Sequence, residues 1–169
     1  VRHAFVYMRG EFSGPYRRLQ AAIDEAYAAG LIGENILGSG LSCDILIYRG
    51  AGSYVCGEAS ALITSIEGKR GYPRNRPPRL TVRGLYQKPT VINNVETLSN
   101  IAWIVTHGSA AFKAIGSPKA SGTRLISLSG HVVNPGVFEI EYGCPWKRLI
   151  YEDAGGMMHG AKLKCVIPG

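Results

Sequence analysis

A glycine-rich turn between an apolar strand and an amphipathic helix constrains this chain more than any other feature. The segment 45–48, Ile-Leu-Ile-Tyr, has the β-branched, apolar composition of a buried strand. Gly50-Ala-Gly-Ser-Tyr-Val-Cys-Gly57 follows it, and apolar residues then recur at helical spacing over 57–67. Such a turn directs backbone N–H groups and a helix N-terminus at whatever lies above the sheet, commonly an anion or a nucleotide. The turn matches neither G-x-G-x-x-G nor a phosphate loop, so a purely structural turn is the main alternative.

A second helix start lies at 93–97. Asn93 can cap this helix, and Glu96, three residues later, can complete a capping box. The predicted helix, 94–107, then carries an apolar stripe formed by Leu98, Ile101, Ala102 and Val105. Two helix starts separated by a long loop predict a single ligand-binding face.

The order of the elements predicts an α/β fold. A strand at 3–8, a helix from Ser13 to Gly30, the strand at 44–48 and the helix at 57–67 follow one another. This alternation is typical of a parallel sheet with helices packed on it.

Composition and periodicity change near residues 116–122, which are rich in Gly, Ser and Pro. We place a domain boundary there, giving domains at 1–118 and 119–169. Beyond it, alternating apolar residues predict a β-hairpin that turns at Asn134-Pro-Gly136. A short helix starting at Pro145 and a strand at 163–167 complete the predicted second domain.

The loop 68–89 is long and basic. It carries seven Lys or Arg residues with no acid between Glu67 and Glu96, and it accounts for the net charge of +7. Long irregular segments in compact domains are usually functional. The loop is either simply solvated or a docking patch for a dinucleotide phosphate, an acidic partner or nucleic acid. Nucleic acid is disfavoured, because no nucleic-acid-binding module is recognisable.

Several other function classes are also disfavoured. The four cysteines are scattered without C-x-x-C spacing, which is typical of buried thiols in a reducing compartment and predicts no metal site in the chain. A metal role for His131 would require partners that the sequence does not reveal. No stretch approaches 18 apolar residues, so we expect no direct membrane insertion. The chain begins at Val1 rather than Met, and we expect an internal fragment.

Linked motifs along the chain resemble one known family. They are Gly50-Ala-Gly-Ser-Tyr-Val-Cys-Gly-Glu58, Ser65-Ile-Glu-Gly-Lys69, Pro73-Arg74, Pro77-Pro78, Gly84-Leu-Tyr86 and Lys88-Pro-Thr-Val-Ile-Asn-Asn-Val-Glu-Thr-Leu98. In this order they resemble the flavin-binding, NADH-oxidising subunit of respiratory complex I. The same family includes the diaphorase subunits of NAD-reducing hydrogenases and of NAD-dependent formate dehydrogenases.

The resemblance implies a Rossmann-like FMN domain, incomplete here, followed by part of a ubiquitin-like β-grasp domain of the soluble-ligand-binding type. It implies that FMN is the cofactor, that NADH is the substrate, and that a [4Fe–4S] cluster is held by a segment outside this chain. No protein side chain is required as a catalytic acid or base, because the flavin carries the redox chemistry. The residues implied to contact FMN are Gly50, Gly52, Tyr54, Gly57, Glu58, Asn93, Asn94 and Thr97, and those on the NADH side are Tyr54, Glu58, Ala59, Arg76 and Arg79.

Three positions depart from the family pattern on the NADH side. Ala59 stands where the family usually has a second Glu, and Arg79 follows Pro77-Pro78 where an aromatic residue is usual. Arg76 replaces a Lys, which keeps the charge but changes the donor geometry.

The resemblance therefore predicts part of the flavoprotein subunit of an NADH dehydrogenase (quinone), with this fragment alone inactive. The implied partners are the [2Fe–2S] subunit and the large iron–sulfur subunit of the peripheral arm, on the cytoplasmic face of the inner membrane. Two alternatives stay open. One is a diaphorase subunit of an NAD-linked hydrogenase or formate dehydrogenase, and the other is a degenerate or truncated docking module without catalysis.

Overall fold

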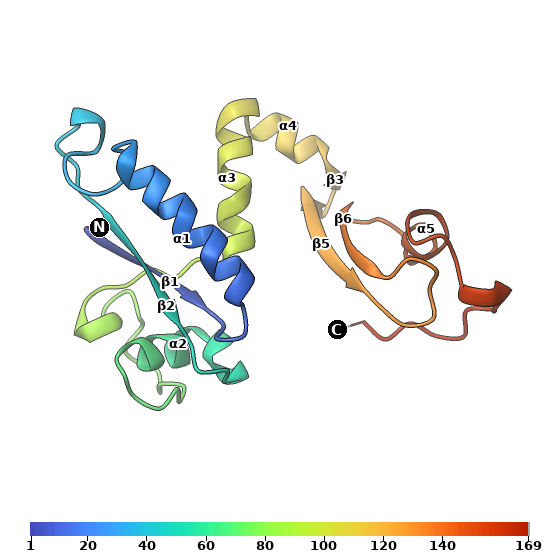
Figure 1. Ribbon diagram of the computed structural model, residues 1–169, viewed down its shortest axis with the longest axis horizontal. Helices are drawn as coiled ribbons and strands as arrows, with labels where there is room; N and C mark the ends of the chain where they lie inside the picture. Colours follow the sequence, from blue (N-terminus) through green and yellow to red (C-terminus); the bar gives the residue numbers. More distant parts are fainter. Residues whose placement is uncertain (169) are drawn as a thin grey trace. The chain divides into compact units, whose positions relative to one another are not determined.

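The computed structural model describes residues 1–168 and divides them into two compact units (Figure 1). The first unit runs from Val1 to Ile92 and the second begins at Asn93. Together they form a mixed α/β structure with small parallel and antiparallel sheets. Within the described residues, no helix is long and apolar enough to cross a membrane.

The first unit contains a parallel pair of strands. Strand β1 (His3–Met8) pairs with β2 (Asp44–Arg49), with His3 opposite Asp44 and Met8 opposite Arg49. Helix α1 (Ser13–Ala28) connects them and packs on β2, as Figure 1 shows. These elements confirm the two predicted strands, their parallel pairing and the predicted helix.

Helix α2 (Ala59–Ile66) is shorter than the predicted helix at 57–67. Residues Tyr54–Gly57 form a separate 3₁₀ turn, and Glu58 is extended, with φ −74° and ψ 133°. Because Glu58 takes the N-cap position, the helix cannot begin before Ala59. The helix is then largely buried, through Ser60, Ala61, Ile63, Thr64 and Ile66.

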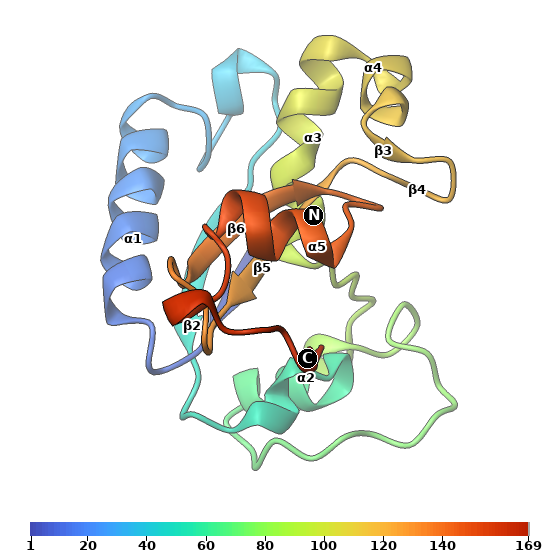
Figure 2. The ribbon, with the colours of Figure 1, turned by 90° about the vertical axis from the view of Figure 1, so that its right-hand side faces the viewer.

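The second unit begins with α3 (Val95–His107) and α4 (Ser109–Ala114), which Figure 2 shows leading into the segment at 116–122. The cap of α3 differs from the prediction. Asn94, not Asn93, caps the helix, its Oδ1 accepting from the Glu96 N–H at 2.8 Å. Glu96 forms no capping box, since its Oε1 accepts from the Leu125 N–H at 3.2 Å instead.

Residues 116–122 form a hairpin of two very short strands, β3 (Gly116–Ser117) and β4 (Ala120–Ser121), rather than an irregular linker. Gly122 is buried, and a Cβ there would collide with the Phe112 ring. The compact units divide after Ile92, and our proposed domain boundary at 118/119 stays a prediction.

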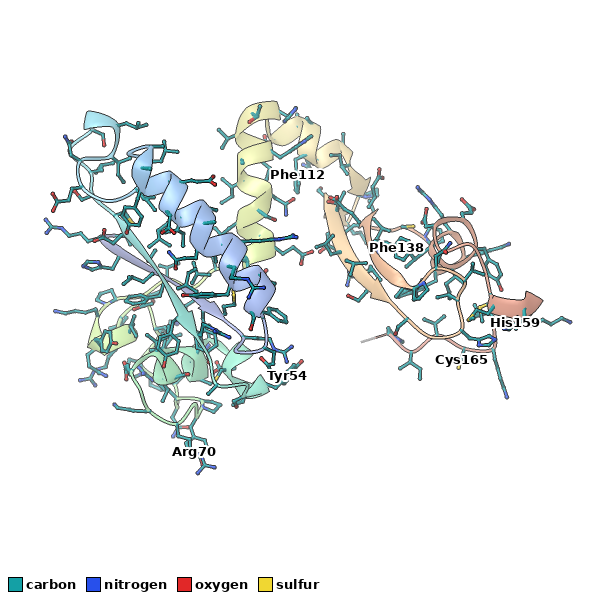
Figure 3. All side chains as sticks on the ribbon, in the orientation of Figure 1. Tyr54, Arg70, Phe112, Phe138, His159 and Cys165 are labelled. Atoms are coloured by element: carbon teal, nitrogen blue, oxygen red, sulfur yellow. The ribbon has the colours of Figure 1, made fainter. Side chains whose placement is uncertain are left out.

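The remaining elements build a small core in the second unit. Strands β5 (Thr123–Leu128) and β6 (Gly136–Glu141) form the predicted antiparallel hairpin. The predicted short helix is α5 (Trp146–Arg148), which continues as a π-helical turn, Leu149–Asp153. Figure 3 shows Phe138 on the side of the hairpin that faces this turn. The core is formed by Val132, Ile150 and Ala154, with Leu128, Phe138, Met157 and Val166 packed against them.

The strand predicted at 163–167 is wrong. The chain there is irregular, and only Val166 packs against the core. Ile167 is 90% exposed. A strand requires a hydrogen-bonded neighbour, and within residues 1–168 no strand pairs with this segment.

Candidate functional site

The glycine turn lies at the carboxyl edge of the parallel pair. Because β1 and β2 run parallel, the segments that follow them, beginning at Arg9 and Gly50, leave the sheet side by side. The Gly50 N–H donates to the Met8 carbonyl at 2.8 Å, and Arg49 Nη2 donates to the Gly10 carbonyl at 2.7 Å. A Cβ on Gly10 would collide with the Gly50 carbonyl. The sequence prediction missed Gly10, although a glycine directly after the first strand was the available signal.

The three predicted glycines of the turn serve different purposes. Gly50 has no room for a side chain, because the Tyr7 phenol fills the space. Gly52 has φ +86°, a conformation that disfavours side chains. Gly57 has neither restriction, because a Cβ there would meet nothing within 4 Å and φ is not positive. Packing therefore explains why residue 50 is glycine, and backbone conformation explains why residue 52 is glycine. Neither explains Gly57, which has open space beside it.

Glu58 is the N-cap of α2. Its Oε2 accepts from the backbone N–H groups of Ser60 and Ala61, each at 2.9 Å, and from the Ser60 hydroxyl at 2.5 Å. The Ser60 hydroxyl, helped by the two backbone N–H groups and the nearby Arg76 charge, lowers the pKa of Glu58 despite opposing desolvation. The side chain is a fixed carboxylate at neutral pH and not a proton donor.

Two of the predicted NADH-side residues lie together. Arg76 Nη2 lies 3.5 Å from Glu58 Oε1, on the side of the carboxylate that does not cap the helix. Tyr54 is 91% exposed, and its label in Figure 3 lies at the edge of the first unit. Ala59 is half-buried as the first residue of α2, and Arg79 is exposed in the loop.

The other predicted residues, Asn93, Asn94 and Thr97, belong to the second unit and are exposed. Asn94 Oδ1 is occupied by the cap of α3, so a ligand would find mainly its amide donor. A role for these three beside the glycine turn stays a prediction.

The basic loop is anchored by one carboxylate, Glu67, which the sequence did not single out. Arg74 Nη2 lies 2.8 Å from Glu67 Oε2, and the Tyr86 N–H donates to Glu67 Oε1 at 2.9 Å. Arg74 also donates to Thr64 Oγ1 at 3.0 Å and to the Gly84 carbonyl at 3.2 Å. The side chain of Glu67 is only 5% exposed. Burial raises the pKa of Glu67. The hydrogen bonds from Arg74 and the Tyr86 N–H, with the charges of Arg74 and Lys69, outweigh this effect, so the net shift of the pKa is downward.

A cavity of about 330 Å³ lies between α2 and this loop. Its floor includes Ser60 and Thr64 of α2, and its rim includes Tyr72, Pro78 and Gln87. Four cationic side chains, Lys69, Arg74, Arg76 and Arg83, line it together with Glu67. Arg76 thus lines the cavity and also lies beside Glu58 of the turn.

A hydrogen-bonded cluster of Tyr7, Tyr48 and Ser65 connects the strand pair to α2 beside the turn, and the sequence did not predict it. The Tyr7 hydroxyl lies 3.0 Å from Ser65 Oγ, and the Tyr48 hydroxyl donates to the Ser65 carbonyl at 2.8 Å. Burial raises the pKa of Tyr7, and neighbouring Cys56 raises it further against the Ser65 hydrogen bond. No local sequence pattern joins residues 58 positions apart, so this cluster could not be predicted.

The cysteines are less uniform than predicted. Cys56 is buried, Cys43 and Cys144 are half-buried, and Cys165 is exposed, so the expectation of buried thiols is wrong for Cys165. Among residues 1–168, no three His, Cys, Asp or Glu side chains gather closely enough to hold a metal ion.

Fold and site define an α/β protein with a glycine-rich strand-to-helix turn at the carboxyl edge of a parallel strand pair, where α/β proteins commonly bind nucleotide ligands. The family model described as the Nuo51 FMN-binding domain matches residues 1–103. The chain belongs to this family.

Curated relatives match nearly the whole chain. An NADH-quinone oxidoreductase subunit of Streptomyces coelicolor is 50% identical over 167 residues, which cover 99% of this chain and 37% of that protein. The mitochondrial NADH dehydrogenase [ubiquinone] flavoprotein 1 of Dictyostelium discoideum is 50% identical over 167 residues, covering 98% of this chain and 35% of that protein. The chain thus spans little more than a third of the length of these relatives.

A solved structure is also similar. The crystal structure of an NAD⁺-reducing [NiFe]-hydrogenase in the H₂-reduced state matches 91% of this chain and 25% of the hydrogenase chain, with a TM-score of 0.79 and 39% identity.

Proposed function

We propose that this chain is part of the flavoprotein subunit of an NADH dehydrogenase (quinone), which transfers a hydride from NADH to FMN and passes electrons on to iron–sulfur clusters. The observation that carries the proposal is 50% identity to the NADH-quinone oxidoreductase subunit of Streptomyces coelicolor across 99% of the chain. The sequence prediction of this function and the family membership of the chain agree.

The residues of the turn fit FMN. The space beside the Gly57 Cα is open, so the packing of the protein does not require a glycine there. A flat ring or a phosphate can approach the backbone closely only where no side chain intervenes.

The chain's own residues hold and orient the reactants in this proposal. Gly52 and Gly57 let the cofactor approach the backbone closely, and the exposed ring of Tyr54 offers a stacking surface. Glu58 contributes a fixed negative charge at the start of α2, which Arg76 partly balances. Ala59 and Arg79 lie on the NADH side.

Asn93, Asn94 and Thr97 are assigned to the ribityl-phosphate part of FMN. Their amide and hydroxyl groups are the donors that this part of the cofactor needs. Asn94 keeps its amide for the cofactor, because its carbonyl oxygen caps α3.

The finer fold assignments belong to the same proposal. The pair β1–β2 is part of a Rossmann-like parallel sheet in an FMN domain at 1–118, and residues 119–169 are part of a β-grasp domain. A [4Fe–4S] cluster is held outside this chain. The [2Fe–2S] subunit and the large iron–sulfur subunit are the partners, at the cytoplasmic face of the inner membrane.

A diaphorase subunit of an NAD-linked hydrogenase is the second candidate. The structural similarity to an NAD⁺-reducing [NiFe]-hydrogenase, with a TM-score of 0.79, favours it. Both candidates use the same flavin chemistry and differ only in their partner subunits.

Flavin content and NADH oxidation test the proposal. We would purify the protein with all flanking segments of its reading frame, and compare Gly57→Val with Gly14→Val. A Cβ added to either glycine would meet nothing within 4 Å, but only Gly57 belongs to the turn. We expect bound FMN and NADH-dependent ferricyanide reduction, with FMN affinity lowered by roughly tenfold or more in Gly57→Val alone.

A protein that retains no FMN and oxidises no NADH would support the non-catalytic docking module instead. Equal effects of the two valine substitutions would remove the assignment of the turn as the flavin site. Subunits that copurify would separate complex I from a hydrogenase or formate dehydrogenase.

A further inference from the structure

Two of the four histidines lie close together in the second unit. The ring centroids of His131 and His159 are 6.1 Å apart, and the rings are tilted by 55°, so they do not stack. The other two histidines are engaged elsewhere, because His107 Nδ1 is 3.0 Å from a backbone carbonyl and His3 Nδ1 is 3.6 Å from a carboxylate oxygen. Within residues 1–168, no hydrogen bond or ion pair occupies the ring nitrogens of the close pair. Both side chains are exposed, so these nitrogens are available to a ligand from solvent.

The backbone beside His131 is fixed to the core of the second unit. The Met158 N–H donates to the His131 carbonyl at 3.2 Å, and Val132 pairs with Met157 in an antiparallel bridge. Val132 is 5% exposed and belongs to the core. The two segments that carry the histidines are therefore joined at their backbones, next to buried residues.

The backbone of His159 is also constrained. His159 lies in the 3₁₀ turn Met158–Gly160 with φ +54°, and Figure 3 labels it in this turn. This left-handed conformation is uncommon for residues with a side chain, and histidine is among the few types enriched in it. The Ala161 N–H closes the turn by donating to the Met158 carbonyl at 3.1 Å. Groups that are held in place before a ligand arrives lose less conformational entropy when they bind it.

The separation of the two rings fits a shared metal ion. Histidine nitrogens bind Zn²⁺ at about 2.0–2.1 Å, which places the metal about 3.2 Å from each ring centroid. Two rings on one ion then have centroids roughly 5 Å apart at the tetrahedral angle and up to about 6.5 Å apart at wider angles. The observed 6.1 Å lies within this range, and rotation of either exposed ring can reach the tetrahedral separation.

We propose that His131 and His159 form a binding site for a late first-row divalent metal ion, the class of Ni²⁺, Cu²⁺ and Zn²⁺. Imidazole suits these metals, whereas Mg²⁺ and Ca²⁺ prefer oxygen ligands. Among residues 1–168, no third His, Cys, Asp or Glu joins the pair, so water completes the coordination. The sequence revealed no partner for His131, and the structure supplies His159. The site lies in the second unit and does not depend on the proposed function.

A metal at this site would stabilise the second unit. His131 and His159 are far apart in the sequence and meet only when the chain is folded. An ion that binds both imidazoles therefore favours the folded state, and the stabilisation grows with the metal concentration.

Calorimetric titration of the full chain with NiCl₂ tests the site, and MgCl₂ is the negative control. The test variants are His131→Asn and His159→Asn, made singly and together, because asparagine also tolerates the left-handed conformation of residue 159. His3→Asn is the matched control, since it removes an exposed histidine of the first unit. Cys165→Ser removes the exposed thiol, which is a competing metal ligand.

We expect one Ni²⁺ to bind per chain, and each single asparagine variant of the pair to bind it at least roughly tenfold more weakly. The double variant should lose little more than either single variant, because either loss breaks the shared site. His3→Asn and Cys165→Ser should bind Ni²⁺ as the wild type does. Ni²⁺ should also raise the melting temperature of the wild type but not of His131→Asn. Circular dichroism verifies that each variant is folded, and either histidine variant alone decides the matter if the other does not fold.

A wild-type chain that binds no Ni²⁺, or that binds Mg²⁺ equally well, would overturn the proposal. Additive losses in the double variant would indicate two separate single-histidine sites and would overturn it too. An equal loss in Cys165→Ser would assign the metal to the thiol instead. An equal loss in His3→Asn would indicate unspecific binding to surface histidines, which also contradicts the proposed site.

Discussion

Helices α2 and α3 begin in similar ways and are packed very differently. Each starts at a polar cap, Glu58 or Asn94, that accepts hydrogen bonds from backbone N–H groups of its first turn. Five of the eight residues of α2 are buried, whereas none of α3 is. Ile63 of α2 is 1% exposed, and Ile101 of the predicted stripe of α3 is 48% exposed.

The difference shows what an apolar stripe predicts. Helical spacing identifies the face that avoids water but not the element that covers it. In the first unit, Tyr7 and Tyr48 of the strand pair bond Ser65 of α2, and the loop anchored by Glu67 bonds α2 through Arg74. In the second unit, the core is formed by the hairpin and the turn after α5, without α3. Cap strength and core burial are therefore separable, and substitutions can test each.

The largest expected effect comes from truncating one isoleucine in each helix, Ile63 in α2 and Ile101 in α3. Ile63→Ala should lower the free energy of unfolding by about 3 kcal/mol, because it leaves a cavity in a closed core. Ile101→Ala should cost less than about 1 kcal/mol, since the side chain is already half-exposed. Urea denaturation followed by circular dichroism measures both. Equal losses would show that a surface covers α3 in solution.

Glu67→Gln should cost about 2 kcal/mol, because it leaves Arg74 without its ionic partner in a largely buried position. The cost should depend on pH. The pKa of Glu67 is lower in the folded chain than in the unfolded chain, so its stabilisation is present above the unfolded pKa, about 4.3. It disappears as the pH falls through the folded pKa.

Unfolding of the wild type and Glu67→Gln at several pH values would test this dependence. The difference between them should be constant near neutrality and shrink below about pH 4. Asp24→Asn, which removes an exposed carboxylate from α1, is the control. A difference that grows on acidification would contradict the assigned sign.

The two caps provide a smaller and more direct comparison. Glu58→Ala should cost about 1–2 kcal/mol and Asn94→Ala about 1 kcal/mol or less. The carboxylate of Glu58 accepts three hydrogen bonds near the start of α2, whereas the Asn94 side chain accepts one. Denaturation of both alanine variants measures the order, and a greater cost at Asn94 would reverse our ranking of the caps.

The sequence predicted elements whose signals are local. The strands β1 and β2, helix α1 and the hairpin β5–β6 follow from periodicity and turn residues, and the parallel pairing of β1 with β2 follows from the strand–helix–strand order. It did not predict interactions between distant residues, such as Tyr7 with Ser65 or Tyr86 with Glu67. These contacts anchor the glycine turn and the basic loop.

The errors have the same origin. Two adjacent asparagines, 93 and 94, are equivalent as caps in a sequence, and in the structure the extended Asn94 takes the cap position. Alternation at 163–167 resembles a strand, but a strand forms only beside a partner. The candidate site was predictable as far as the turn and its glycines. The cavity was not, because it depends on how the loop folds back on α2. The cap of Glu58 was missed although it is local, because the predicted helix began at 57 and so placed Glu58 inside it.

The smallest expected effect concerns the first residue of α2. In the complete protein, Ala59→Glu should change NADH affinity by several-fold and leave FMN content nearly unchanged, because a second carboxylate beside Glu58 adds acceptors and negative charge on the proposed NADH side. A carboxylate in a first helical turn is itself favourable by about 0.3–1 kcal/mol, so it should not unfold α2. Ser109→Glu, at the first residue of α4, places the same charge at a helix start outside the turn and serves as the control. Titration of NADH against each variant, with melting temperatures measured in parallel, separates binding from packing. Unchanged NADH affinity together with a lower melting temperature in Ala59→Glu would show that Ala59 is a packing position, in keeping with its half-buried place beside the buried face of α2.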